Sequence, residues 1–278
     1  MSGIKHTVLF AHLQDLETPH YLGPPITSVA AVTTEALVIV LFSQLFRTAD
    51  SMEQWDDVQK LLTYVYVKAT KAAQDLGKVL LDISVVLKDP SESFPNDFGN
   101  DVDMCFRIQG WCVPLCADNI PCASLLALIG SYPVVALGGT FDHLHAGHKI
   151  LLSMAAWIAS SKVIVGVTGM IMPYNPTRSF LQFFRPELEY EIVAIKDVYG
   201  PTGWDPNIQA LVVSMETLPG AASIDKKRAA ESLPPLRTFV IDVISSESEK
   251  LDHEDMEMLK QTKLSSTFIR DWIVKNTV

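Results

Sequence analysis

The amino-acid sequence predicts an α/β fold in which a parallel sheet carries helices on both faces. Short apolar runs typical of buried strands recur in the second half of the chain, at residues 134–137, 163–167, 191–195, 209–214 and 237–244. Helical segments are predicted between them, near residues 180–184, 222–232 and 251–261. Strands that alternate with helices imply a parallel sheet, and such sheets bind ligands beyond the carboxyl ends of their strands.

A smaller α/β region is predicted to precede this sheet, over residues 1–130. Its expected strands are residues 7–10, 37–42 and 80–87, and a helix is expected over residues 52–74 because apolar side chains recur there at helical spacing. Residues 89–103, rich in proline, glycine, serine and acids, read as a linker. The second domain is expected over residues 131–278, and the sequence leaves the role of the first region open.

The composition limits the kind of partner and location. A net charge of −10 argues against a general nucleic-acid binder or a protein that binds anionic membranes. The most apolar window, residues 28–46, contains a carboxylate and several hydroxyl and amide groups, so we expect no membrane span. The first residues lack the pattern of a signal peptide, and the four cysteines match no common zinc spacing. The expected location is the cytoplasm.

One stretch, residues 134–160, carries the chemistry. A buried strand ends in Gly138 and Gly139, which let the backbone turn and approach a ligand closely. A polar loop and a helix follow, and within nine residues they supply Thr140, Asp142, His143, His145 and His148. The start of a helix presents unpaired N–H groups and the positive end of its dipole, so an anion is favoured there. Imidazole groups can donate to phosphate oxygens.

Other interpretations of the histidines are weaker. His143, His145 and His148 could bind zinc, but their H-x-H-x-x-H spacing makes a poor closed site, and no metal site is predicted. A dinucleotide fold would require G-x-G-x-x-G after the strand, which this spacing does not supply. A solvated loop with incidental histidines is the third alternative.

A second motif lies near the end of the sequence, where three hydroxyl-bearing residues, Ser265, Ser266 and Thr267, precede an amphipathic segment. Simple capping of a helix explains one hydroxyl. Three in a row, with Arg270 one turn later, favour a second phosphate site over capping alone.

These residues also carry a resemblance to a known family. The stretch GGTFDHLHAGH, residues 138–148, resembles the first signature of nucleotidyltransferases of the HxGH type, and LSSTFIR, residues 264–270, resembles their second. The segment between, residues 187–216, is similar to phosphopantetheine adenylyltransferases of the eukaryotic and archaeal type. The similarity covers residues 132–278 and implies a Rossmann-like nucleotidyltransferase domain. Fungal members similarly carry an N-terminal extension, and the absence of a kinase domain after Arg270 favours the monofunctional form.

The resemblance implies transfer of AMP from ATP to 4′-phosphopantetheine, which gives dephospho-CoA and pyrophosphate in coenzyme A biosynthesis. Thr140 would bind the acceptor phosphate, His145 and His148 the ATP phosphates and the transition-state charge, and Arg270 the pyrophosphate. Mg²⁺ is expected with ATP, held largely by phosphate oxygens rather than by protein ligands. The other implied nucleotide-binding residues are Gly138, Gly139, Phe141, Gly147, Arg228, Ser265, Ser266 and Thr267.

The chain departs from the family at residues 169–177, GMIMPYNPT. The family has a lysine-bearing segment there that serves the acceptor, whereas this chain has no lysine between Lys162 and Arg178. The acceptor site is therefore expected to be impaired unless another residue replaces the lysine. The alternatives are a catalytically weak nucleotide-binding or scaffold protein of coenzyme A synthesis, which contacts other enzymes of that synthesis through residues 1–130, and a nucleotidyltransferase with another phosphate acceptor.

Overall fold

The computed structural model describes residues 3–48, 51–92, 94, 98–108, 132–168, 176–241 and 266–276. The chain divides into two compact units. The first unit is Met1–Ala49 with Asp56–Leu128, and the second unit is Asp50–Trp55 with Ile129–Val278. Within the described ranges, no helix has both the length and the apolar character needed to cross a membrane.

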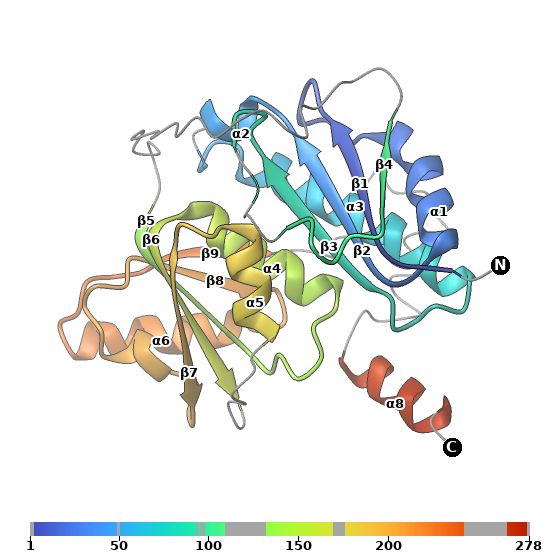
Figure 1. Ribbon diagram of the computed structural model, residues 1–278. Coiled ribbons are helices and arrows are strands. Elements are labelled where there is room, and N and C mark those ends of the chain that lie inside the picture. The colour runs from blue at the N-terminus through green and yellow to red at the C-terminus, as the bar shows by residue number, and fades with distance from the viewer. Residues whose placement is uncertain are drawn as a thin grey trace. The chain divides into compact units, whose positions relative to one another are not determined.

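The first unit is built on a four-stranded parallel sheet with strand order β3-β2-β1-β4 (Figure 1). Its strands are β1 (Ile4–His12), β2 (Thr33–Phe42), β3 (Asp82–Lys88) and β4 (Met104–Arg107). Its helices are η1 (His20–Leu22), α1 (Gly23–Val32), α2 (Leu45–Thr48) and α3 (Trp55–Asp75). The predicted strands and the predicted long helix are present. Their ends are shifted by at most three residues, except at the start of β2, which lies four residues earlier than predicted.

Two elements of this unit have no counterpart in the prediction. Helix α1 opens with Gly23, Pro24 and Pro25, which weaken any helical signal at that point. Strand β4 has only four residues, none of them buried, so it lacks the apolar run that marks a strand. Strand β4 forms because it pairs with β1, and helix α1 forms because it packs against β1 and β2.

The two faces of this sheet are covered by different segments. Val8 and Phe10 pack with Phe94 and Phe98 on one face. Thr7 points to the opposite face, because side chains alternate along a strand, and its hydroxyl lies 2.6 Å from that of Thr33, at the end of α1. The chain therefore leaves β1 on one face of the sheet and returns toward β4 across the other.

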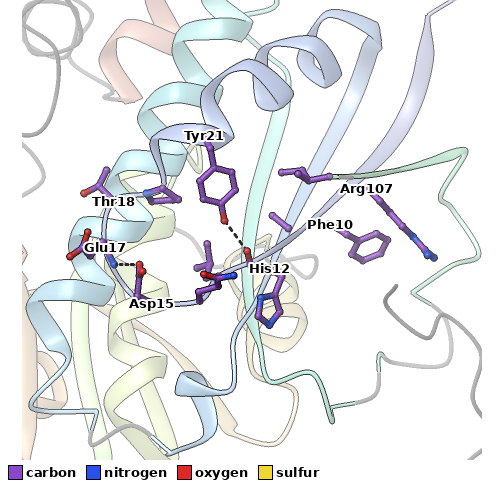
Figure 2. Close-up of a pocket in the computed structure, with 12 residues that line it drawn as sticks. Phe10, His12, Asp15, Glu17, Thr18, Tyr21 and Arg107 are labelled. Atoms are coloured by element: carbon purple, nitrogen blue, oxygen red, sulfur yellow. Dashed lines mark hydrogen bonds between the residues drawn. The ribbon is translucent and has the colours of Figure 1, made fainter. Parts of the chain in front are cut away.

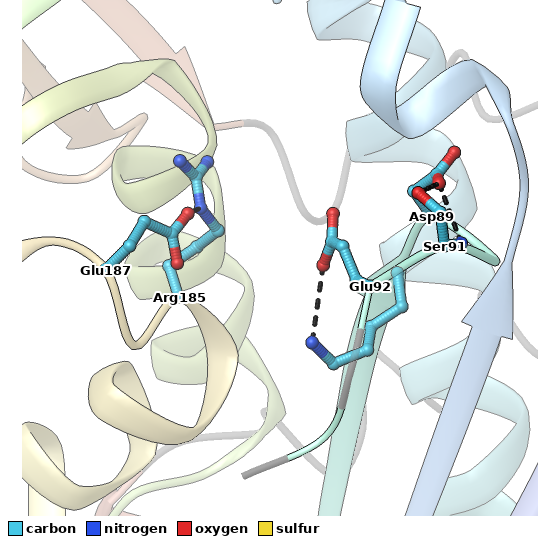
Figure 3. A network of polar contacts seen from close by, with 6 residues as sticks. Asp89, Ser91, Glu92, Arg185 and Glu187 are labelled. Atoms are coloured by element: carbon cyan, nitrogen blue, oxygen red, sulfur yellow. Dashed lines mark hydrogen bonds and ion pairs between the residues drawn. The ribbon is translucent and has the colours of Figure 1, made fainter. Parts of the chain in front are cut away.

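The turn after β3 is held by polar contacts. Lys88 is only 4% exposed, and its ammonium group lies 3.3 Å from a carboxylate oxygen of Glu92 (Figure 3). Asp89 accepts a hydrogen bond of 2.8 Å from the backbone N–H of Ser91. A buried charge of this kind requires an ionic or hydrogen-bonding partner, and Glu92 supplies one.

The second unit contains a five-stranded parallel sheet with strand order β7-β6-β5-β8-β9. Its strands are β5 (Tyr132–Gly139), β6 (Ala159–Thr168), β7 (Glu189–Ile195), β8 (Ala210–Ser214) and β9 (Arg237–Ile241). Its described helices are α4 (Ala146–Ile158), α5 (Pro176–Phe184), η2 (Gly200–Gly203), α6 (Leu218–Ala230) and α8 (Ser266–Asn276). Strand β5, which carries the glycine turn, is the centre of the sheet.

Helices cover both faces of this sheet, as the sequence predicts. Ala221 and Ile224 of α6 pack with Ala136 of β5 on one face. Val135 and Leu137 point the other way by strand alternation, toward the buried side of α4.

The turn from α5 into β7 is held by two contacts of Arg185. Its guanidinium pairs with Glu187 (Figure 3), and the backbone carbonyl of Arg185 accepts a hydrogen bond from the hydroxyl of Tyr190. The predicted helix over residues 251–261 and the end of the strand predicted over 237–244 lie outside the described residues.

Candidate active site

The candidate site lies where β5 ends and α4 begins. The chain leaves the sheet after Gly139, and α4 starts with His145 as its N-cap residue, in extended conformation. The neighbouring strand β6 ends at Thr168, whose hydroxyl donates to that of Thr140 at 3.2 Å. Thr168 is a residue of this candidate site that the sequence motifs did not indicate. The sequence could have indicated it, because Thr168 directly follows the strand predicted over residues 163–167, and the carboxyl ends of parallel strands meet at one edge of the sheet.

The buried ring of Phe141 supports the loop between β5 and α4. Its φ is +36°, which is uncommon for a residue with a side chain, and its ring is only 5% exposed. A Cβ atom added to Gly139 would lie 3.0 Å from two carbons of this ring, so the glycine leaves the space that Phe141 fills. The ring centroid lies 4.8 Å from that of His148. The side chain of Phe141 therefore acts as a support for His148, and any contact with a nucleotide would come from its backbone.

His145 and His148 stack on each other at the start of α4. Their ring centroids are 3.9 Å apart, with 27° between the ring planes. Burial and, to a lesser extent, the neighbouring His148 together lower the pKa of His145 to about 3, against the opposing effect of Asp142. Two imidazolium ions in such close contact would repel each other. His145 is therefore neutral near pH 7.

The tautomer of His148 follows from one contact. Its Nδ1 atom lies 3.0 Å from the carbonyl oxygen of His143, and a carbonyl can only accept, so Nδ1 carries a hydrogen. Burial lowers the pKa of His148, although the contact with His143 and the charge of Asp142 act in the opposite direction. The neutral ring therefore has a bare Nε2 atom. Nε2 becomes a donor only when the ring is protonated.

An ion pair joins this loop to the last described helix. Nη1 of Arg270, on α8, lies 2.8 Å from Oδ2 of Asp142, and Oδ1 of the same carboxylate accepts a 3.0 Å bond from the N–H of His143. The structure thus brings Arg270 to the histidine loop. Ser265 lies outside the described residues, and so do the side chains of Ser266 and Thr267, the first two residues of α8.

Arg228 occupies a different environment. It is 1% exposed, and its guanidinium donates to the carbonyl oxygens of Thr202, Asp205 and Pro234 at 2.6, 3.0 and 2.7 Å. Burial lowers its pKa, while the charges of two aspartates raise it. These bonds tie α6 to η2 and to the loop before β9. One nitrogen, Nη2, is buried without a partner in the described part of the chain, and the nucleotide-binding role of Arg228 stays a prediction.

The roles predicted for the two remaining glycines, Gly138 and Gly147, stay predictions. Gly138 tolerates a Cβ atom sterically, since the nearest atom would lie 3.6 Å away, and Gly147 lies in the first turn of α4. The described residues contain no group of three or more histidine, cysteine or acidic side chains placed to hold a metal ion. The departure at residues 169–177 falls almost entirely outside them: only Pro176 and Thr177, which open α5, are described.

The second unit matches a known family in sequence. The family model described as Cytidylyltransferase-like matches residues 136–271, a span that contains both the histidine loop and Arg270. With the parallel sheet and the polar groups at its carboxyl edge, this match defines the second unit as a nucleotidyltransferase domain.

The relatives are more specific. Phosphopantetheine adenylyltransferase of Saccharomyces cerevisiae is 38% identical over 156 residues, which cover 49% of this chain and 51% of the relative. An uncharacterized protein of Schizosaccharomyces pombe is 36% identical, with 51% and 48% covered. Phosphopantetheine adenylyltransferase of Pyrobaculum aerophilum is 36% identical over 124 residues, which cover 40% of this chain and 79% of the relative. This chain belongs to the phosphopantetheine adenylyltransferase family. Its matched segment spans about half the length of the two yeast relatives.

Proposed function

We propose that this protein transfers AMP from ATP to 4′-phosphopantetheine and releases pyrophosphate and dephospho-CoA. The observation that carries the proposal is the pair of stacked histidines at the start of α4, next to the hydroxyls of Thr140 and Thr168. The names of the relatives from Saccharomyces cerevisiae and Pyrobaculum aerophilum support the choice of acceptor. The proposed location is the cytoplasm, with other enzymes of coenzyme A synthesis as partners of the first unit.

The reaction needs no general base. A terminal phosphate oxygen of the acceptor attacks the α-phosphorus of ATP, and the bond from that phosphorus to the bridging oxygen of the β-phosphate breaks. The acceptor phosphate is already largely a dianion near neutral pH, so no proton has to be removed from it. Catalysis then rests on holding the two phosphates in line and on neutralising the charge that gathers around the α-phosphorus.

Thr140 is suited to hold the acceptor phosphate. It is exposed at the carboxyl end of the central strand, and its oxygen accepts the bond from Thr168. Its own hydroxyl hydrogen can therefore point at a phosphate oxygen. Gly138 and Gly139 let the backbone approach the nucleotide, and Gly147 does the same in the first turn of α4.

The two histidines would hold the ATP phosphates in different ways. His148 can donate through Nε2 only as an imidazolium, and the negative charge of a bound phosphate would stabilise that form. His145 has a buried Nδ1 atom with no hydrogen-bond partner in the described part of the chain, so Nε2 is the nitrogen that can reach a phosphate. It would donate from the neutral ring in the tautomer that carries the hydrogen on Nε2. The pair thus supplies one charged and one neutral donor.

The second motif would bind the leaving group. Arg270 places a positive charge next to the histidine loop, where the pyrophosphate would gather charge. Ser265, Ser266 and Thr267 would add hydroxyl and backbone donors at the start of α8. Mg²⁺ would arrive on the phosphates of ATP, and no step of the proposal depends on a protein ligand to it.

The test is pyrophosphate release from ATP with and without 4′-phosphopantetheine. The unmodified chain should release pyrophosphate only with the acceptor, and His148→Ala should abolish the release. His143→Gln is the matched control, because only its backbone takes part in the contacts above. Release that does not depend on the acceptor, or none at all from the unmodified chain, would contradict the proposal.

A further inference from the structure

The strand order of the first unit creates a second place where a ligand could bind. From β1 the chain proceeds through β2 to β3 on one side, then returns to add β4 on the other side of β1. The connection from β1 to β2 and the connection from β3 to β4 lie on opposite faces of the sheet, as the contacts of Thr7 and Phe94 show. In parallel sheets, the carboxyl edge between two such strands is open and forms a ligand crevice. Here that edge lies between the ends of β1 and β4.

A cavity occupies this crevice. It has a volume of about 500 Å³ and is lined by the ends of β1 and β4 and by the loop that leads to η1 (Figure 2). Small-molecule sites in proteins are typically about 300–1,000 Å³. The hydroxyl of Tyr21 donates to the carbonyl of His12 at 2.8 Å and so holds the loop against the end of β1. Topology and cavity therefore indicate the same position independently.

The lining does not suit a phosphate. Helix α1, which follows this loop, has prolines at positions 24 and 25, and these supply no N–H groups. The N–H groups of His20 and Leu22 are already bonded to backbone carbonyls. Asp15 and Glu17 line the cavity and would repel an anion, and their two negative charges exceed the one positive charge of Arg107, which also lines it. This edge therefore lacks the donor-rich helix start found beside β5 in the second unit.

The lining does suit a neutral molecule with hydroxyl groups and a flat ring. Carboxylates accept hydrogen bonds strongly, and two of them, Asp15 and Glu17, can bind a pair of neighbouring hydroxyls. Tyr21 is 52% exposed and offers an aromatic surface for stacking. Figure 2 shows Arg107 beside Phe10, across Tyr21 and His12 from the two carboxylates. We propose that the first unit binds an uncharged nucleoside at the carboxyl ends of β1 and β4.

Calorimetric titration of the full chain with adenosine would test this proposal. Saturating ATP is added first, so that the proposed site of the second unit is already filled. We expect one equivalent of adenosine to bind, and hydrogen exchange to slow in peptides from residues 10–22. Asp15→Asn with Glu17→Gln removes the charges but keeps oxygen acceptors, and should weaken binding on the order of tenfold. Tyr21→Ala should weaken it similarly, whereas Tyr21→Phe keeps the ring and should retain most of the affinity.

The controls separate this site from the catalytic one. Asp75→Asn removes a carboxylate of the same unit at the end of α3 and should leave adenosine binding unchanged. Thermal melts of each variant show whether it is folded. Absence of adenosine binding in the presence of ATP would overturn the proposal, as would slowed exchange confined to residues 134–148 or an affinity that the double variant leaves unchanged. His148→Ala should not affect adenosine binding, so the outcome is independent of adenylyl transfer.

Discussion

Arg270 and Asp142, 128 positions apart in the sequence, form an ion pair with 2.8 Å between Nη1 and Oδ2. The other oxygen of Asp142 accepts from the N–H of His143, whose carbonyl in turn accepts from Nδ1 of His148. A continuous series of hydrogen bonds therefore runs from the second motif to the ring that we propose as a phosphate donor. Asp142 sits at the centre of this series and is a positioning residue in the proposed reaction.

Replacement of Asp142 by asparagine should lower kcat/KM strongly but should lower the free energy of unfolding only slightly. The pair is partly exposed, 52% at Arg270 and 29% at Asp142, and exposed pairs contribute at most about 1 kcal/mol to the free energy of unfolding. Misplacement of a charged group at the phosphates typically costs activity on the order of ten- to a hundredfold. Steady-state kinetics and urea unfolding of the same variant give the two quantities.

A double-mutant cycle shows whether Asp142 acts through Arg270. If it does, Asp142→Asn should cost little in a chain that already carries Arg270→Gln. Glu231→Gln, which breaks another surface ion pair of the second unit, is the matched control and should leave the kinetics unchanged. Additive losses in the cycle would show that Asp142 acts independently of Arg270.

ATP binding should be accompanied by proton uptake at His148. Burial holds the pKa of the free ring below its ordinary value of 6.5, and the contact of Nδ1 with a carbonyl requires protonation before Nε2 can donate. A bound phosphate raises this pKa, so ATP should bind more tightly as the pH falls through the pKa of the complex, by at most about tenfold per pH unit.

Calorimetry in buffers of different ionisation enthalpy measures the number of protons taken up. ATP itself gains a proton in this pH range, so the relevant quantity is the difference between the unmodified chain and His148→Gln. His143→Gln should behave as the unmodified chain does. Equal proton uptake in all three proteins would rule out a protonated His148 in the complex.

The fold of the second unit could be predicted because its strands are apolar runs and its helices have apolar stripes. The same logic missed β4, whose residues are exposed or half-buried, and α1, whose first turn contains two prolines. In those elements contacts with neighbours outweigh local pattern.

Only the part of the candidate site that comes from one continuous stretch of sequence could be predicted. Thr140, His145 and His148 are close in sequence, so the turn between β5 and α4 brings them together by itself. The Thr168 contact and the Asp142–Arg270 pair required the sheet order and the position of α8. The resemblance implies a nucleotide-binding role for Arg228, and only the fold shows that its guanidinium is buried against three carbonyls.

His145 should make the protein less stable in acid. Its pKa is about 3 in the folded chain, against an ordinary value of 6.5. Above pH 6.5 both folded and unfolded chains carry a neutral ring, so this group has no effect. Below pH 6.5 the unfolded chain takes up a proton that the folded chain does not, and stability falls until the pH nears 3. By linkage the loss at pH 5.5 is on the order of 1 kcal/mol.

Urea unfolding at pH 7.5 and pH 5.5 measures this loss. His145→Asn should show a smaller decrease between the two pH values than the unmodified chain, by on the order of 1 kcal/mol. His143→Asn removes a histidine of the same loop whose ring makes none of the contacts described above, and should keep the full decrease. If His145→Asn also keeps it, burial of His145 does not cause the acid sensitivity.

Gly139 and Gly138 are adjacent, but alanine should have different effects at the two positions. At Gly139 the added Cβ atom would lie 3.0 Å from two ring carbons of Phe141, which is buried and supports His148. Displacement of that ring should lower the free energy of unfolding by about 1–3 kcal/mol, as overpacking does elsewhere, and should also lower kcat. At Gly138 the nearest atom would be 3.6 Å away, an ordinary contact, so Gly138→Ala should change stability little. Urea unfolding of both variants is the measurement, and equal losses of stability would show that Phe141 has room to move.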